Sequence, residues 1–375
     1  MNGKDIHDAV EYVGYDLVDM AEKQRFTRPF WQTALPMAAM IALLLGVTVT
    51  LPRPAQPPEL SAPTEPPVLT APSMGETTIE PKPEDTATIH PLNEMFPLLE
   101  EIPSDALPEV DWNTFYLNEA GLDDDGTALT TIHGDQVLAI DAKNGILLIR
   151  VKGEDYQGVL AVVNDPMQLS LQASSQLGVE GEAVGTIAEA HNGILAVNGS
   201  HFIDDEGSGN GGHLAGYAMC DGVEYNTEAH YGTGYDRLEI NDNGIFSLTD
   251  ADSSVSPHTQ NAVEAIPILI QDGTILVDKD CGFTGIHPRT CIGQASEGAI
   301  LVLVIEGRMQ ERSLGTDVIE CAKILKRYDC ENALNLDGGT SSILWYDGEY
   351  ITKCSNSALP EGRPLPNAFV VERAE

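Results

Sequence analysis

The sequence predicts an α+β fold in which a strand-rich domain, with mixed or antiparallel sheet and few helices, follows one transmembrane helix and a disordered stalk. Three observations predict this order: a charge-free apolar segment near the N-terminus, a proline-rich segment after it, and many short β-rich runs in the rest of the chain. We therefore divide the chain into residues 1–30, 31–51, 52–108 and 109–375.

Residues 31–51 are predicted to cross a membrane once. The segment carries no charged residue, and about 20 apolar residues span the hydrocarbon core of a bilayer. Lys23, Arg25 and Arg28 precede it, so the positive-inside rule places the N-terminus in the cytoplasm and the large domain outside. The alternative is a cleaved signal peptide, whose apolar region would be shorter and would end at small residues. We expect an uncleaved signal-anchor in the cell membrane.

The segments on either side of this anchor read differently. Residues 1–30 have apolar residues at steps of three and four, which indicates a short cytoplasmic helix that docks an undefined partner or lies along the membrane. Residues 52–108 contain 14 of the chain's 23 prolines. Such a segment buries too little apolar surface to fold, and its prolines favour extended conformations. We expect a semi-rigid stalk that holds the domain away from the membrane at the cell surface.

The charge balance excludes one class of partner. The chain has 58 Asp+Glu against 20 Lys+Arg, a formal net charge of −38. Nucleic acids are bound by clustered lysine and arginine, so we expect no nucleic-acid binding. An anionic substrate would have to be held by a few arginines against a repulsive background.

The cysteines do not indicate a metal site. All six lie in the last domain, where an even count permits disulfides, but no CxxC pair suggests zinc. We expect most of them to be small buried residues. They are Cys220, Cys281, Cys291, Cys321, Cys330 and Cys354.

The domain from residue 109 onward reads as strands with two helices. Residues 183–191 end at an Asn-Gly stop, and residues 317–328 begin with Asp317 as N-cap and Glu320 three residues later, a capping box. Turn signals separate the β-rich runs, and strands outnumber helices, which is typical of the α+β class. The runs are 137–141, 146–151, 159–163, 194–197, 266–270, 274–277, 300–305, 343–346 and 368–371.

Two polar clusters lie next to predicted strands: one follows the strand 194–197, and the other precedes the strand 300–305. The segment from Asn198 to Gly212 is glycine-rich, so backbone can approach a ligand there; the alternatives are a Ca²⁺ loop, although EF-hand spacing is absent, and a plain surface loop. Arg289 precedes the strand 300–305 and can hold a phosphate through two hydrogen bonds. The alternative for Arg289 is an ordinary surface salt bridge.

Two further clusters contain carboxylates. Glu306 and Arg308 end the most apolar strand, where they either face a shared cleft or form a structural ion pair at its rim. Asp337 lies between an apolar run and two glycines, with hydroxyls just after it. A part-buried carboxylate near exposed N–H groups and hydroxyls is the strongest site candidate in the sequence.

The motifs occur in one order between about residues 155 and 372 and together resemble the phosphodiester glycosidase family, whose bacterial members are described as related to exopolysaccharide biosynthesis. Each motif alone is weak, but their common order is specific. Ser200, His201, Thr340 and Cys291 depart from the family pattern, and none of these changes removes a charged motif residue. The motifs are Asn164 to Pro166, Leu177-Gly178, Asn198 to Gly212, Arg289 to Gly293, Glu306 to Arg308, Asn335 to Ser342, and Arg363 to Phe369.

The resemblance implies hydrolysis of a sugar-1-phosphodiester at the anomeric carbon. Phosphate is a good leaving group, so it needs charge neutralisation more than a strong acid, and Arg289 together with Arg308 would supply this. Asp337 is the first choice and Glu306 the second for the carboxylate that acts as base or nucleophile. His201 assists or is structural. The remaining predicted substrate-binding residues are Asn198, Gly338, Gly339, Ser341 and Ser342.

The predicted function is therefore that of a membrane-anchored extracytoplasmic hydrolase in cell-surface glycan or exopolysaccharide metabolism, with a carbohydrate or sugar-phosphate substrate. No cofactor is certain, and a divalent metal at Asp337 or in residues 204–210 would be detected by loss of activity in EDTA. Two alternatives come from other classes: a non-catalytic polysaccharide-binding module, and a glycosyl transferase that uses the same site to pass sugar to an acceptor.

Overall fold

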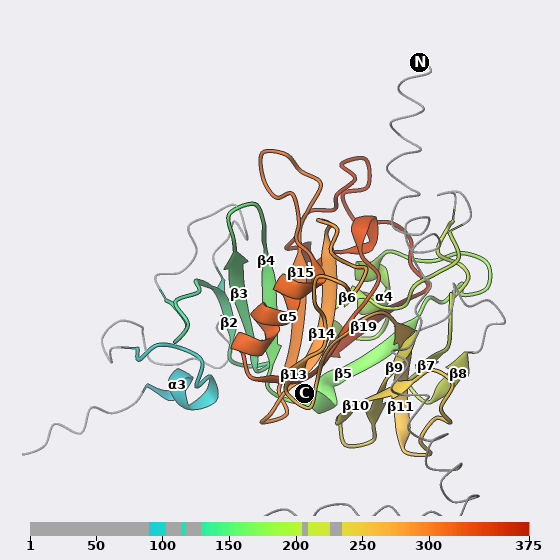
Figure 1. Cartoon of the computed structure of the whole chain (residues 1–375). Coiled ribbons are helices and arrows are strands. Elements are labelled where there is room, and N and C mark those ends of the chain that lie inside the picture. Colours follow the sequence, from blue (N-terminus) through green and yellow to red (C-terminus); the bar gives the residue numbers. More distant parts are fainter. Residues whose placement is uncertain (1–89, 103–114, 118–128, 205–208, 226–234, 375) are drawn as a thin grey trace, which may run out of the picture. The chain divides into compact units, whose positions relative to one another are not determined.

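The computed structural model describes residues 90–102, 115–117, 129–204, 209–225 and 235–374 (Figure 1). The predicted cytoplasmic segment, the predicted transmembrane helix and residues 52–89 of the predicted stalk lie outside these ranges. Within these ranges, no helix is both long and apolar enough to span a bilayer. The chain divides into two compact units, and all the described residues belong to the unit that includes residues 88–375.

The largest element is a nine-stranded sheet in which every paired neighbour is antiparallel. Its central strands are almost continuously apolar because both faces are covered. Across the sheet the order is β1 (Phe115–Leu117), β2 (Val137–Asp141), β3 (Ile146–Lys152), β4 (Gln157–Val163), β15 (Ile300–Ile305), β14 (Arg289–Ala295), β16 (Cys330–Asn335), β12 (Ile268–Gln271) and β13 (Thr274–Ile275).

Two five-stranded antiparallel sheets pack against one face of this sheet and share one apolar core with it. The first has the order β18 (Glu349–Tyr350), β17 (Leu344–Tyr346), β6 (Gly193–Asn198), β19 (Asn367–Glu372) and β5 (Leu169–Ala173). The second has the order β10 (Phe246–Asp250), β9 (Asp236–Asn241), β11 (Thr259–Ala265), β7 (Ala218–Cys220) and β8 (Val223–Tyr225).

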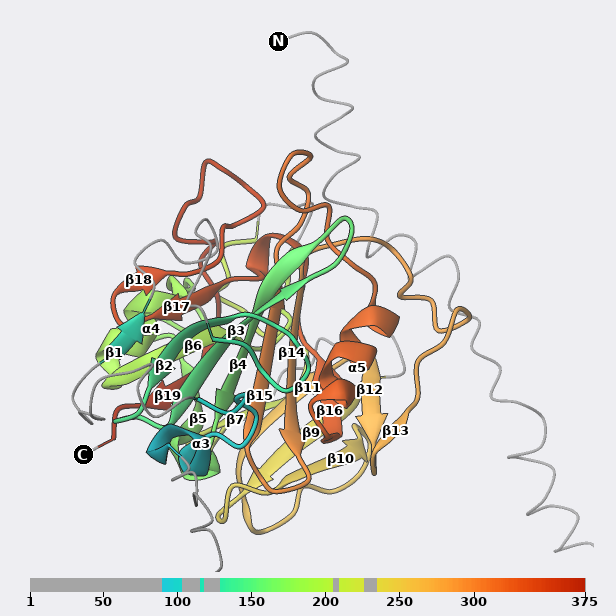
Figure 2. The same cartoon turned by 90° about the vertical axis from the view of Figure 1, so that its left-hand side faces the viewer.

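Two helices cover the outer faces. α5 (Val318–Arg327) packs on the far face of the nine-stranded sheet, and α4 (Val184–Ala190) packs on the outer face of the sheet that contains β6. Figure 2 shows α4 and α5 on opposite sides of the layered sheets. Asp317 accepts a hydrogen bond from the N–H of Glu320 at 2.8 Å, so the predicted cap is confirmed. The strand-rich antiparallel class with few helices is likewise confirmed.

The folded part begins earlier than the sequence predicts. Residues 90–102 were assigned to the stalk, but α3 (Pro91–Met95) and the segment after it pack on the α5 side of the nine-stranded sheet. Leu92, Phe96, Leu99 and Ile102 are each at most 3% exposed. Pro91 does not oppose this helix, because a proline is well tolerated in its first turn. The proline count thus hid a spaced set of apolar residues.

All six cysteines lie in described parts of the domain and are free thiols, as predicted for small buried residues. Five are buried, and Cys281 is partly exposed. Burial raises the pKa of both Cys220 and Cys330 to about 12. Thiols of this kind are unreactive at neutral pH and serve as apolar packing groups.

Candidate active site

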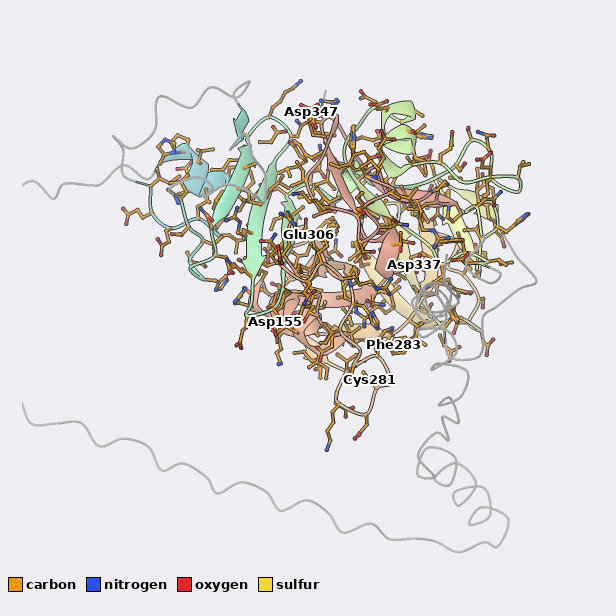
Figure 3. All side chains as sticks on the ribbon, turned by 90° about the horizontal axis from the view of Figure 1, so that it is seen from above. Asp155, Cys281, Phe283, Glu306, Asp337 and Asp347 are labelled. Carbon is orange, nitrogen blue, oxygen red and sulfur yellow. The ribbon has the colours of Figure 1, made fainter. Side chains whose placement is uncertain are left out.

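Several strands end at one edge of the layered sheets. β14 starts there, and β15 and β16 end there, because both are antiparallel to β14. In the adjacent sheet β6 ends at Asn198, which pairs with Ala368 near the start of β19. The polar motifs at these strand ends are therefore brought together from distant parts of the sequence, and Figure 3 looks down on the molecule with Asp337 and Glu306 labelled.

The Asp337 carboxylate is the centre of this region. Its Oδ1 lies 3.4 Å from Nδ1 of His201 and accepts a hydrogen bond from the N–H of Gly338 at 2.9 Å. The Ser341 hydroxyl also donates to the carboxylate. The Asp337 side chain remains 20% exposed, so a ligand can reach it.

Asp337 is held in its ionised form. Burial by itself raises the pKa of this carboxyl, but the hydrogen bonds and charge of His201, the Ser341 hydrogen bond and the positive charge of Arg363 outweigh it and lower the pKa below the ordinary 3.8. A carboxylate with a low pKa acts as a nucleophile or electrostatic stabiliser more readily than as a proton donor.

The turn after Asp337 requires glycine. Gly339 has φ +63°, a conformation that costs other residues energy, and a Cβ on Gly339 would lie only 3.2 Å from the guanidinium of Arg308. Gly338 is close to the carbonyl of Pro288. Both glycines of the predicted motif therefore let Arg308 and the segment before β14 approach the backbone beside Asp337.

Of the two arginines that the sequence predicts to bind phosphate, Arg308 is the one that lies next to this turn. Its own φ is +59°, which is uncommon outside glycine and is often found at functional sites. An Nη2 atom of Arg308 lies 3.4 Å from Nδ1 of His287. The two residues form a basic pair beside Gly339. His287 was not among the predicted site residues, although its sequence neighbours were.

Arg289 is used differently. Its guanidinium donates to three backbone carbonyls: those of Thr316 at 3.2 Å, Phe283 at 3.3 Å and Gly285 at 2.8 Å. Side chains alternate along a strand, and the next residue, Thr290, faces the inter-sheet core where it bonds Asn198. Arg289 therefore points to the opposite face of β14 and anchors the loop that carries Phe283, which Figure 3 labels.

Glu306 is a buried anchor as well. Its side chain is 0% exposed and receives hydrogen bonds from both the Nε and Nη2 atoms of Arg312, the Nε2 of Gln157 and the N–H of Lys353. These contacts hold the segments after β15 and β18 to the start of β4. In Figure 3 Glu306 and Asp337 lie apart. The structure thus brings together Asp337, His201 and Arg308, and gives Glu306 other partners.

Asn198 is fully buried and joins two strand ends. Its Nδ2 donates to the backbone carbonyl of Asp337 at 2.7 Å, and its Oδ1 accepts from the Thr290 hydroxyl at 2.7 Å. Both polar groups of the amide are thereby engaged within the protein. This arrangement fixes the backbone of Asp337, whereas the predicted contact of Asn198 with sugar stays a prediction.

Two buried polar atoms near Asp337 have no hydrogen-bond partner among the described residues, namely Nε2 of His201 and Oγ of Ser342. Buried polar atoms are normally satisfied by protein, water or ligand. His201 also contacts the ring of Tyr235 edge to face, with centroids 5.8 Å apart. Both atoms belong to residues that the sequence singled out as substrate-binding.

Besides His287, sequence reasoning did not name Arg363 as a site residue, and it named Asp204 only as part of a candidate metal segment, residues 204–210. Arg363 Nη1 lies 2.9 Å from an Asp204 carboxylate oxygen, and its charge acts on Asp337. Both residues lie in motifs of the family pattern, which was the signal for them, but nothing in the sequence showed that Arg363 and Asp204 would pair. Across the described ranges, no group of three or more His, Cys, Asp or Glu side chains has the arrangement of a metal site.

A shallow hollow lies at the opposite end of β6, far from Asp337. β6 runs from Gly193 at the hollow to Asn198 at the site, a length of about 17 Å. None of the predicted site residues lines it. Its walls are Glu189, Asn192, Gly193, Trp345, Asp347, Gly348 and Arg373.

Among solved structures, three similar ones match at low identity. The catalytic domain of zebrafish N-acetylglucosamine-1-phosphodiester alpha-N-acetylglucosaminidase, auto-inhibited by its pro-peptide, is 19% identical with a TM-score of 0.49, covering 60% of this chain and 82% of that one. A putative exported protein from Burkholderia pseudomallei is 16% identical with a TM-score of 0.45, covering 58% and 74%. A hypothetical protein from Synechocystis is 14% identical with a TM-score of 0.45, covering 63% of each chain.

Sequence comparison is more specific. The SPbeta prophage-derived uncharacterized protein YomE of Bacillus subtilis (strain 168) is 28% identical over 184 residues, which is 47% of this chain and 28% of that protein. The chain thus spans less than a third of that relative's length. Residues 191–372 match the family model described as phosphodiester glycosidase, and this range includes Asp337, His201, Arg308 and Arg363. The resemblance predicted from the motifs is thereby confirmed: residues 191–372 are similar to the phosphodiester glycosidase family.

Proposed function

We propose that this domain hydrolyses a sugar-1-phosphodiester, with Asp337 as the reacting carboxylate. The observation that carries the proposal is the state of that carboxylate. It is ionised, 20% exposed and in contact with His201, and the guanidinium of Arg308 packs against the turn that follows it. The similarity to the family supplies the reaction class, and the geometry supplies the assignment of roles.

The phosphate side of the substrate fits Arg308 and His287. When the bond between the anomeric carbon and the phosphate oxygen breaks, the electron pair leaves with the phosphate, which gains negative charge. A guanidinium aimed at this oxygen stabilises that charge. Arg308 lies beside Gly339 and therefore near the reacting carboxylate, whereas the guanidinium of Arg289 is engaged by three carbonyls of a loop. We therefore assign phosphate binding to Arg308.

The carbohydrate side fits Asp337, His201 and Ser342. The carboxylate either takes a proton from a water that adds to the anomeric carbon, or attacks that carbon itself and is released by water in a second step. The first route inverts the anomeric configuration and the second retains it, so the anomer of the released sugar distinguishes them. The buried His201 Nε2 and Ser342 Oγ, which have no hydrogen-bond partner among the described residues, would bond sugar hydroxyls or phosphate oxygens.

The cellular setting is part of the same proposal. The apolar segment 31–51 would anchor the chain, with its N-terminus in the cytoplasm and the glycosidase domain outside. The substrate would then be a phosphodiester of a cell-surface glycan or an exopolysaccharide.

The test is turnover of α-GlcNAc-1-phospho-methyl and related sugar phosphodiesters by the full-length protein, followed as free sugar. Asp337→Asn should lower kcat/KM by on the order of 10³-fold. Asp347→Asn is a matched control, because Asp347 is an exposed aspartate at the opposite end of β6. Full activity in a folded Asp337→Asn protein would refute the central role. Binding without turnover would favour a polysaccharide-binding module, and sugar transfer to an added acceptor would favour a transferase.

A further inference from the structure

The residue that supports His201 lies far away in the sequence. His201 is on the first leg of a hairpin whose legs are residues 201–204 and 209–215. The Ala215 N–H donates to the His201 carbonyl at 3.0 Å, the Ile203 N–H donates to the His213 carbonyl at 2.8 Å, and Phe202 pairs with Leu214. Whatever fixes the two legs of this hairpin also fixes the imidazole beside Asp337.

Arg363 joins these two legs. Its Nη1 lies 2.9 Å from Asp204 Oδ2 on the first leg, and its Nη2 donates to the Gly209 carbonyl on the second at 3.0 Å. The guanidinium carbon lies 4.4 Å from the ring centre of Phe202, within cation–π range. Asp204 completes the arrangement, because its Oδ1 accepts the N–H of Gly209 at 2.6 Å.

This arrangement is well shielded from solvent. The side chains of Arg363 and Asp204 are 18% and 14% exposed. A two-pronged arginine contact with low exposure is worth more than a surface ion pair, because solvent screens it less. Lysine cannot replace it in full, since an ammonium does not offer two parallel donors in one plane.

We propose that Arg363 is a positioning residue of the active site: it joins the two legs of the hairpin at Asp204 and Gly209 so that His201 meets Asp337, and its positive charge acts on the Asp337 carboxylate. This inference rests on the proposed function only where activity is the readout. It assigns Arg363 a role distinct from that of Arg308, which lies beside Gly339.

The charge effect has a definite sign. The groups that act on Asp337 are His201 through a hydrogen bond and its charge, Ser341 and the Gly338 N–H through hydrogen bonds, and Arg363 through its charge. Arg308 and His287 lie beyond Gly339, and Asp204 faces Arg363. Removal of the Arg363 charge disfavours the ionised carboxylate, so the pKa of Asp337 should rise. As the pH is lowered, activity that needs the ionised carboxylate should then be lost at a higher pH than in the parent protein.

The experiment compares Arg363→Met, which keeps only the apolar stem, with Arg363→Lys, which keeps the charge. Arg363→Gln is a second neutral variant, which retains a donor for the Gly209 carbonyl if the methionine variant does not fold. The Asp337 titration is followed in the full-length protein by NMR of ¹³C-labelled aspartate, with Asp337→Asn to assign the signal. The pH profile of kcat/KM is measured in parallel.

We expect the Asp337 midpoint, and the acid limb of kcat/KM, to move up by roughly half a pH unit or more in the neutral variants and to stay near the parent value in Arg363→Lys. Unchanged midpoints in folded neutral variants would overturn the proposal, as would equal shifts in the lysine and neutral variants. The NMR midpoint needs no substrate, so it decides this question even if the protein hydrolyses no sugar phosphodiester.

Discussion

Asp337 and Glu306 are both carboxylates in family motifs at strand ends of the nine-stranded sheet, yet their surroundings differ. Glu306 is 0% exposed and bonded by Arg312, Gln157 and Lys353. Asp337 is 20% exposed, and its Oδ1 contacts His201 and the N–H of Gly338. A carboxylate with many strong internal donors stabilises the fold, whereas one with exposed oxygen and a lowered pKa is available for chemistry.

The largest expected effect separates these two roles. Asp337→Asn should lower kcat/KM by on the order of 10³-fold with little change in stability, as argued for the reacting carboxylate. Glu306→Gln should instead lower the free energy of unfolding by about 2–3 kcal/mol, because Arg312 loses its charged partner at a largely buried place. Urea unfolding and kinetics at a temperature where all variants are folded measure the two quantities separately.

The comparison would fail if the effects were exchanged. A folded Glu306→Gln protein with a kcat/KM loss as large as that of Asp337→Asn would return Glu306 to the chemistry. A loss of stability in Asp337→Asn comparable to that in Glu306→Gln would make Asp337 structural.

Arg308 and Arg289 allow a similar contrast between a residue proposed to bind phosphate and a residue that anchors a loop. Arg308→Ala should lower kcat/KM by roughly 10²–10³-fold, since it removes the donor that we propose for the leaving phosphate. Arg289→Lys should act mainly on the loop that it anchors through Phe283, Gly285 and Thr316, with faster proteolysis of residues 278–287. Limited proteolysis and kinetics on both variants test this. Arg289→Lys with intact loop protection and a larger kinetic loss than Arg308→Ala would reverse the assignment.

The sequence predicted the strand-rich class of the fold, but not which way each side chain of the candidate site points. Asp337, His201, Arg308 and Ser341 were all named in advance and lie in one region. Arg289 and Thr290 are neighbours in one motif, yet they face opposite sides of β14, and a motif does not state which side of a strand meets the substrate. Arg363 and Asp204 are about 160 residues apart, so their pairing emerges only from tertiary structure.

Asp236 is a third kind of carboxylate, in which hydrogen bonds do not offset the cost of burying the charge. Burial raises the pKa of Asp236 to about 6, and the negative charge of Asp250 raises it as well. A hydrogen bond from the Ile268 N–H lowers the pKa but does not offset these two effects. The unfolded chain has the ordinary pKa of 3.8, so this group favours the folded state below about pH 4 and loses that contribution as the pH rises through 6.

Asp236→Asn should therefore stabilise the protein more at pH 7.5 than at pH 4, by about 1–2 kcal/mol in the difference, allowing for the partial exposure of the side chain. Urea unfolding at the two pH values measures it. Asp252→Asn is the control, because Asp252 is exposed in the turn that follows β10, the edge strand of the same sheet. An equal change at both pH values would show that Asp236 is ionised at no cost in the folded state.

Asp317 is expected to give the smallest effect, because it is a carboxylate whose work is entirely local. It caps α5 by accepting the Glu320 N–H at 2.8 Å, and it follows Thr316, whose carbonyl accepts from Arg289 at 3.2 Å. Asp317→Ala should lower the free energy of unfolding by about 1 kcal/mol, while Asp317→Asn, which still caps, should cost much less. Kinetics should be within about twofold of the parent in both, since a cap substitution perturbs only its own helix end. An alanine variant as stable as the asparagine variant would show that packing of Val318, Cys321 and Leu325 holds the helix start without its cap.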